Sequence, residues 1–176
     1  MVEKSTSSRS RHVALGAVFA TLYAGGVTLL APISFQVYQV RVADCLLPLS
    51  ILFGPPAIVG LTIGTFFGNL SSPFGPVDIV GGAFANLLAT YVAWQIGKRG
   101  SRVYWFAGTV GATLAITFVV GTYLSFLLGI PVWSGWVGVV IGEIIAVNFG
   151  GYLLLTGVFR VMGRRALPQG RVADTR

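Results

Sequence analysis

Four charged side chains interrupt the apolar body of this chain. They are Arg41, Asp44, Asp78 and Glu143. No other residue from 13 to 97 or from 103 to 159 carries a formal charge. A charge within a bilayer is costly, so one that persists there usually faces the protein interior or an aqueous cavity and often marks a substrate path. These positions are therefore the first candidates for binding chemistry.

Glu143 is the strongest of these candidates, because no cation lies near it in the sequence. Trp136 precedes it by seven residues, which on an α-helix is about 20° away and two turns earlier. A planar heterocycle could stack on the indole ring while the carboxylate accepts two N–H bonds, each contributing very roughly 1.5 to 3 kcal/mol. The sequence equally allows Glu143 to form a structural ion pair with Arg41, and Trp136 to lie in an interfacial aromatic belt.

Two asparagines and Asp78 have competing structural roles. Asn86 could bond a ligand or a neighbouring helix, and bonding between helices is favoured. The same interpretation is favoured for Asn148, which lies about 140° from Glu143 around an α-helix, so the two should not both point into one narrow site. Asp78 opens an expected helix, where its carboxylate is expected to cap unpaired N–H groups.

The composition predicts an integral membrane protein. Hydrophobic residues make up 55% of the 176 residues and charged residues only 10%, against about 25% charged in soluble domains. The single cysteine excludes an intramolecular disulfide and a multi-cysteine metal site. No Walker A loop, nucleophile elbow or zinc-protease pair occurs. We therefore expect no enzyme activity, no metal and no cofactor.

The net charge of +7 comes from basic residues grouped at the edges of the apolar runs. The three clusters are Lys4, Arg9 and Arg11; Lys98, Arg99 and Arg102; and Arg160, Arg164, Arg165, Arg171 and Arg176. Such flanking clusters indicate membrane topology rather than nucleic-acid binding.

The number of membrane crossings depends on residues 43 to 70. One long helix there gives five crossings and puts two basic clusters opposite the N-terminus. Two helices, broken at Gly54-Pro55-Pro56, give six and put all three clusters on one side. The sequence therefore predicts an all-α domain over 13–160, between a cytoplasmic N-terminal segment (1–12) and a cytoplasmic tail (161–176). The expected helices are 13–31, 43–54, 56–70, 78–97, 103–129 and 133–159.

The second of these helices is too short to cross a membrane alone. Residues 43–54 would extend only about 18 Å at 1.5 Å per residue. They must tilt, extend or line a cavity. The preceding segment, with Gln36, Gln39 and Arg41, is expected to cap that cavity from outside.

Small residues at four-residue spacing predict close helix packing. Gly60, Gly64 and Gly68 form one such stripe, for which packing within the bundle is favoured. The first helix carries two stripes, which are Gly16, Ala20 and Ala24, and Ala17, Thr21 and Gly25. One of these two could meet another protein.

Several motifs in this sequence resemble those of the queuosine-precursor transporter (QueT) family. The matching residues are Leu22-Tyr23, the run 31–35, Gln39-x-Arg41-Val42-x-Asp44, Asp78-Ile79, Trp136-Val137-Gly138, Gly142-Glu143 and Gly150-Gly151-Tyr152. The chain departs from the family pattern at Ala43-Asp44-Cys45-Leu46, where Ser-Glu-Ala-Leu is usual. The acid is kept there but is one methylene shorter.

The resemblance implies a six-helix substrate-binding S component of an energy-coupling factor (ECF) transporter in the cell membrane. Such a subunit takes up 7-deazaguanine bases used in tRNA modification. It works with a transmembrane coupling subunit and two cytoplasmic ABC ATPases, by toppling within the lipid bilayer. In related S components a small-residue motif on the first helix contacts the coupling subunit, which implies that role for Gly16, Ala20 and Ala24.

The resemblance also suggests roles for the polar residues. Glu143 would bind the N–H edge of a guanine-like base, on which Trp136 or a loop aromatic would stack. Asn86 could recognise a carbonyl or ring nitrogen, and Asn148 is a further candidate. Gln39, Arg41 and Asp44 would close an extracellular lid.

Two other classes of function remain open at this point. One is a solitary proton-coupled carrier of a vitamin-like solute, using Glu143 or Asp44. The other is a membrane assembly protein without transport activity, in which Arg41 and Glu143 pair to fill the interior.

Overall fold

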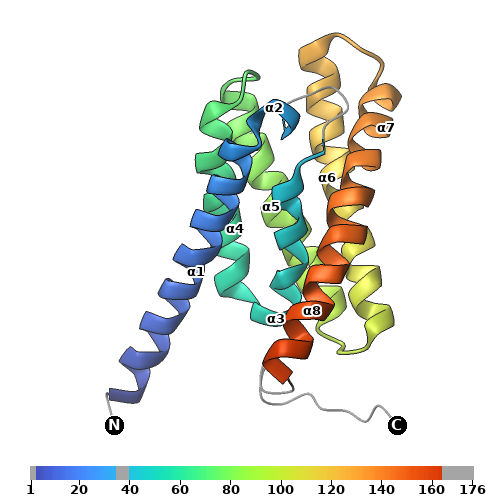
Figure 1. The fold of residues 1–176 in the computed structure, drawn as a ribbon. Helices are drawn as coiled ribbons and strands as arrows, with labels where there is room; N and C mark the ends of the chain where they lie inside the picture. The colour runs from blue at the N-terminus through green and yellow to red at the C-terminus, as the bar shows by residue number, and fades with distance from the viewer. Residues whose placement is uncertain (1–2, 35–39, 164–176) are drawn as a thin grey trace.

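The computed structural model describes the backbone of residues 3–34 and 40–163, and within these ranges it contains helices and no strand (Figure 1). The elements in chain order are α1 (Glu3–Leu29), α2 (Ala31–Ser34), η1 (Val42–Leu49), α3 (Ser50–Phe53), α4 (Pro55–Gly68), η2 (Asn69–Ser71), α5 (Pro76–Gly97), α6 (Arg102–Leu128), α7 (Val132–Glu143), η3 (Ile144–Gly151) and α8 (Tyr152–Met162). The predicted all-α fold is confirmed for these residues.

Four helical segments are long and apolar enough to cross a membrane. They are Arg9–Leu29, Pro76–Gly97, Arg102–Leu128 and Val132–Met162. The last is one continuous rod made of α7, η3 and α8. Each exceeds the roughly 20 residues that about 30 Å of hydrocarbon requires. The chain is therefore a multi-pass membrane protein.

The predicted interruption at Gly54 is also confirmed. Gly54 has a φ of 63°, a left-handed conformation that glycine adopts without steric cost, and it ends α3. Pro55 then opens α4, where its missing N–H needs no helical partner. Residues 43 to 70 are consequently two helical segments and not one long helix.

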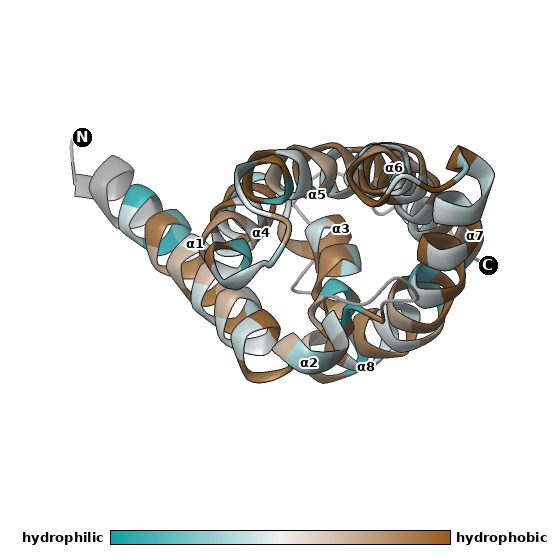
Figure 2. Ribbon diagram, turned by 90° about the horizontal axis from the view of Figure 1, so that it is seen from above, coloured by the Kyte–Doolittle hydropathy of each residue, from teal (hydrophilic) through white to brown (hydrophobic). Residues whose placement is uncertain are grey.

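The short segment formed by η1 and α3 runs through the centre of the bundle. Seen along the bundle axis, α3 lies inside a ring formed by the longer helices (Figure 2). Leu47, Leu49, Ile51 and Leu52 are all at most 5% exposed. η1 is a 3₁₀ helix, which rises about 2.0 Å per residue, so the twelve residues together extend about 22 Å. The extended 3₁₀ geometry and the enclosure by other helices therefore explain how so short a segment can lie at membrane depth.

Tight contact between α1 and α4 depends on the glycines of α4. A Cβ atom at Gly60 would lie 2.9 Å from Cβ of Phe19, and one at Gly64 would lie 2.7 Å from the carbonyl oxygen of Ala20. Real side chains do not fit at these distances, so this stripe packs within the bundle as predicted.

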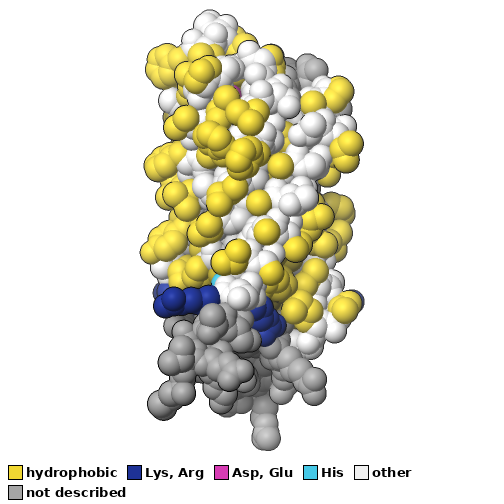
Figure 3. Space-filling view, turned by 90° about the vertical axis from the view of Figure 1, so that its left-hand side faces the viewer, with side chains coloured by type: hydrophobic (Ala, Val, Ile, Leu, Met, Phe, Trp, Pro, Cys, Tyr) yellow, Lys and Arg dark blue, Asp and Glu magenta, His cyan; other side chains and the backbone are white. Residues whose placement is uncertain are grey.

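Basic side chains gather at one end of the bundle. The start of α1, the α5–α6 turn and the end of α8 lie at that end, whereas the α4–α5 and α6–α7 connections lie at the other (Figure 1). On the face shown in Figure 3, the Lys and Arg side chains form a band at the same end. Arg41 is different, because it is buried at 4% exposure.

Candidate functional site

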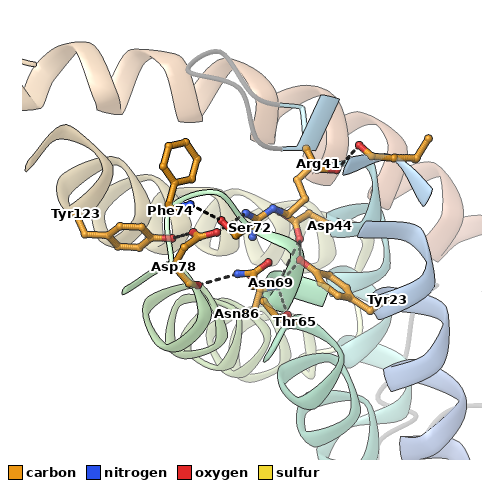
Figure 4. Close-up of polar contacts among 12 residues, drawn as sticks. Tyr23, Arg41, Asp44, Thr65, Asn69, Ser72, Phe74, Asp78, Asn86 and Tyr123 are labelled. Atoms are coloured by element: carbon orange, nitrogen blue, oxygen red, sulfur yellow. Dashed lines mark hydrogen bonds and ion pairs between the residues drawn. The ribbon is translucent and has the colours of Figure 1, made fainter. Parts of the chain in front are cut away.

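The four charged residues that stand apart in the sequence are all buried in the folded chain. Arg41 and Glu143 are 4% exposed, and Asp44 and Asp78 are 1% exposed. Arg41, Asp44 and Asp78 lie with buried tyrosine, threonine and asparagine side chains from α1, α4, η2 and α5 and with a half-buried tyrosine from α6 (Figure 4). Glu143 interacts with Asp44 and Arg41. We call this group the polar cluster; its members are Tyr23, Arg41, Asp44, Thr65, Asn69, Asp78, Asn86, Tyr123 and Glu143.

One part of the polar cluster is centred on Asp78. Its Oδ2 lies 3.8 Å from Nη2 of Arg41, and its Oδ1 accepts a hydrogen bond of 2.5 Å from the hydroxyl of Tyr123. The Asp78 backbone carbonyl accepts a bond of 2.8 Å from Nδ2 of Asn69. The prediction that the Asp78 side chain caps α5 is therefore wrong. It serves instead as the counter-ion of the buried Arg41. A buried cation without a paired anion is strongly destabilising, whereas an exposed helix end can be satisfied by water.

The other part of the cluster joins Asp44 to three helices. The hydroxyl of Tyr23 donates to Oδ1 of Asp44. Nδ2 of Asn86 lies 2.7 Å from the Tyr23 oxygen, 2.7 Å from Oγ1 of Thr65 and 3.4 Å from Oδ1 of Asp44. The interpretation of Asn86 as a residue that bonds other helices is confirmed. Its N–H groups are consequently already directed at protein acceptors.

Glu143 ends α7 and, like Asp78, has a buried carboxyl oxygen without a hydrogen-bond partner among the described residues. Its side chain interacts electrostatically with Asp44 and Arg41. Its Oε2 is buried and has no hydrogen-bond partner among the described residues. Such an atom normally has a partner, because leaving a buried polar group unpaired is costly.

The cluster is also unbalanced in charge. Its three carboxyl groups share one guanidinium, so with every group ionised it carries two uncompensated negative charges. Burying net charge is unfavourable, so the cluster favours a bound proton, a cation or a ligand with several N–H donors.

Trp136 lies outside the polar cluster. Its ring is 36% exposed and packs edge-on against Phe118 of α6 at a centroid distance of 5.2 Å. Its Nε1 donates to Oγ1 of Thr122 at 3.0 Å. The seven-residue spacing from Glu143 therefore does not place the two side chains in one cluster.

The remaining site candidates bond residues outside the polar cluster or are not described. Asn148 accepts a hydrogen bond of 3.2 Å from Oγ1 of Thr113, which is the predicted bond between helices. Gln39, like Gln36, lies outside the described residues.

Gly16, Ala20 and Ala24 line an apolar groove between α1 and α4. The backbones of Gly16 and Ala20 lie against Gly60 and Gly64 of α4, so the first two residues of this stripe pack within the bundle. Ala17 and Thr21 line the same groove, and Thr21 is exposed. The second stripe of α1 is thus the more accessible one.

Tyr23 and Tyr123 are members of the cluster that the sequence did not reveal. Each hydroxyl bonds a carboxylate of an element distant in the chain. The available signal was indirect: a buried tyrosine hydroxyl usually finds a partner, and the apolar body contains three acids for one base.

Comparison with known proteins places this architecture in a family. No match was found among curated proteins or among solved structures. The family model described as QueT transporter matches residues 13–160, from the first long apolar helix to the end of the last. The match covers all residues of the polar cluster, and the chain therefore belongs to the QueT transporter family.

Proposed function

We propose that this chain is the substrate-binding subunit of an ECF-type ABC importer for a queuosine precursor. The substrate would be a 7-deazaguanine base, such as the cyano or aminomethyl form, destined for tRNA modification. A transmembrane coupling subunit and two cytoplasmic ABC ATPases would supply the energy. Membership of a transporter family supports membrane transport, and the unpaired carboxylate oxygen of Glu143 is the observation that carries the substrate proposal.

The chemistry of the base fits that carboxylate. A guanine-like edge presents a ring N–H beside an amino group, and a carboxylate can accept from both. Hydrogen bonds to a charged acceptor are roughly twice as strong as those between neutral groups. In a buried site they also face little competition from water. Such a ligand would satisfy Oε2 of Glu143 and spread part of the excess negative charge.

The proposed topology has six membrane crossings with both termini in the cytoplasm. The basic band at one end of the bundle supports this orientation, because basic residues flank cytoplasmic ends. The polar cluster would then lie toward the extracellular end of the bundle. Gln39, Arg41 and Asp44 would form the lid, and the Arg41–Asp78 pair would tie it to α5.

The coupling subunit would bind at the groove between α1 and α4. Gly16, Ala20 and Ala24 line this groove together with Ala17 and the exposed Thr21. Small residues allow a partner helix to approach closely in lipid.

Binding of the base without ATP tests the proposal. Purified protein should bind 7-cyano-7-deazaguanine in calorimetry, and Glu143→Gln should weaken the affinity at least about tenfold, because one charge-assisted bond contributes about 1.5 to 3 kcal/mol. Glu3→Gln is the matched control, since it removes the same charge at the start of α1 and should leave the affinity unchanged.

Other outcomes point to other functions. Unchanged affinity in Glu143→Gln would remove that residue from the site. Uptake into liposomes that lack any ATPase, driven by a proton gradient, would favour a solitary carrier. Absence of binding by any deazaguanine base would favour an assembly role.

A further inference from the structure

One of the other buried polar atoms without a hydrogen-bond partner belongs to α6, which packs against α7. Oγ1 of Thr117, like Oε2 of Glu143, has no hydrogen-bond partner among the described residues. Thr117 is 5% exposed and Glu143 is 4% exposed. A threonine in a helix ordinarily bonds a backbone carbonyl one turn back, as Thr65 and Thr109 do here. Thr117 therefore retains an unused hydroxyl.

The packing of α6 on α7 places Thr117 near the level of Glu143. Thr117 belongs to a buried ridge of α6 with four-residue spacing, which consists of Thr109, Thr113, Thr117, Gly121 and Ser125. On one side of Thr117, Gly121 lies against Gly135 and Trp136. On the other side, Thr113 bonds Asn148. Thr117 must then face the part of α7 between these contacts, where the ridge Gly135, Val139 and Glu143 is buried.

The helix after Glu143 brings Asn148 toward the same side. η3 is a π-helix, in which hydrogen bonds join residues five apart and each residue turns the helix by a smaller angle than in an α-helix. The predicted angle of about 140° between Asn148 and Glu143 assumed an α-helix, so on this wider helix Asn148 lies less far round from Glu143. Thr113 donates to Oδ1 of Asn148, which fixes the orientation of the amide and leaves its Nδ2 group as a donor.

We infer that Thr117 and Asn148 complete the Glu143 site as donors for a ring carbonyl. A guanine-like edge presents a carbonyl, then an N–H, then an amino group. Glu143 accepts from the two nitrogens, while the Thr117 hydroxyl and the Asn148 amide donate to the two lone pairs of the carbonyl oxygen. Asn86 does not take this role, since its N–H groups are directed at Tyr23 and Thr65. The inference rests on the proposed function and names the groups that select the base.

Calorimetry on the purified full chain tests this assignment with two probes. One is 7-cyano-7-deazaguanine. The other is its analogue without the ring carbonyl oxygen, in which the neighbouring ring nitrogen also has no hydrogen, so only the amino group remains as a donor to Glu143. Thr117→Val keeps the shape and removes the hydroxyl, so it should weaken binding of the first base about three- to tenfold. Its effect on the weaker binding of the analogue should be less than about twofold, because no carbonyl is present. Thr117→Ser, which keeps the hydroxyl, should restore the affinity.

Thr109→Val is the matched control on the same ridge. That threonine is fully buried but bonds the carbonyl of Phe106, so its loss should not change affinity for either base. Equal loss for both bases in Thr117→Val, or no loss for either, would overturn the assignment and leave the proposed function intact. Failure of the wild-type chain to bind any deazaguanine base would overturn both.

Discussion

Arg41 illustrates how single residues in this protein depend on partners remote in sequence. Its guanidinium is buried beside Asp78 from the start of α5, and the carboxyl of Asp44 also interacts with it. A buried cation without such partners would be strongly destabilising. Arg41 thus holds together acids that would otherwise repel one another.

Removing this cation should destabilise the fold. Breaking a buried pair by deleting one partner costs about 3 to 5 kcal/mol, because the remaining charge stays buried. We expect Arg41→Met to lower the free energy of unfolding by roughly this amount, measured by denaturant unfolding in detergent micelles. Arg11→Met, at an exposed site, should change it by less than about 0.5 kcal/mol.

A double-mutant cycle separates the pair from other effects. The double variant Arg41→Met, Asp78→Asn removes both charges of the pair and leaves neither without its partner. The loss in free energy of unfolding should therefore be smaller than the sum of the two single losses. Strict additivity would show that the two side chains do not stabilise each other.

At the scale of elements, two irregular helices meet at the centre of the bundle. η1 is a 3₁₀ helix and η3 is a π-helix, and a Cβ atom at Gly151 of η3 would lie 2.7 Å from Cγ of Pro48 and 3.1 Å from the carbonyl oxygen of Cys45 in η1. π-helical segments often occur at functional sites. Here the contact between η1 and η3 brings Asp44 of η1 near Glu143, which directly precedes η3.

The glycine stripe of α4 should be essential to the position of α1. Gly60→Ala places a methyl group in contact with Phe19 and with the backbone of Gly16, and overpacking of this kind costs about 1 to 3 kcal/mol. We expect a lower thermal midpoint for Gly60→Ala and Gly64→Ala. The measurement is thermal unfolding of the purified variants.

Gly157→Ala is the control for this prediction. Gly157 lies in α8, and a Cβ atom added there would meet no other described atom within 4 Å. Alanine also favours helix by about 1 kcal/mol over glycine, so the substitution should be neutral or stabilising. Similar effects at Gly60 and Gly157 would show that the α1–α4 contact is not limited by space.

At the scale of the whole molecule, the exposed basic side chains and the buried polar cluster lie toward opposite ends of the bundle. The basic side chains mark one end of the bundle, and the connections preceding α5 and α7 mark the other. The polar cluster draws on residues near the latter, including Asp78 in the first turn of α5. This arrangement supports the proposed function, in which the subunit would bind its substrate at one end and meet ATPases at the other.

Cysteine labelling in intact cells tests that orientation. Because Cys45 is the only cysteine, a Cys45→Ala chain offers a clean background. Ser72→Cys and Ile130→Cys should react with a membrane-impermeant maleimide from outside, whereas Gly100→Cys should react only after the cells are opened. Labelling of Gly100→Cys from outside, with the other two protected, would reverse the orientation, and a mixed pattern would contradict six crossings.

Much of this architecture follows from local sequence. Runs of apolar residues predicted the four long membrane helices, because only helices satisfy the backbone in lipid. Gly54 and the two prolines predicted the central break, because their backbone preferences act on neighbouring residues only. The burial of Arg41, Asp44, Asp78 and Glu143 was predictable for the same reason, since a charge in an apolar run must avoid lipid.

Only the tertiary structure decided which of these side chains meet. The pairing of Arg41 with Asp78, the bond from Tyr23 to Asp44 and the accommodation of Gly60 against α1 join residues from different helices. The π-helical turn also reoriented Asn148 relative to Glu143. The sequence alone determined that these residues are helical and buried, because hydropathy and backbone preference are local properties. Their partners depend on the register between packed helices, which no single segment encodes.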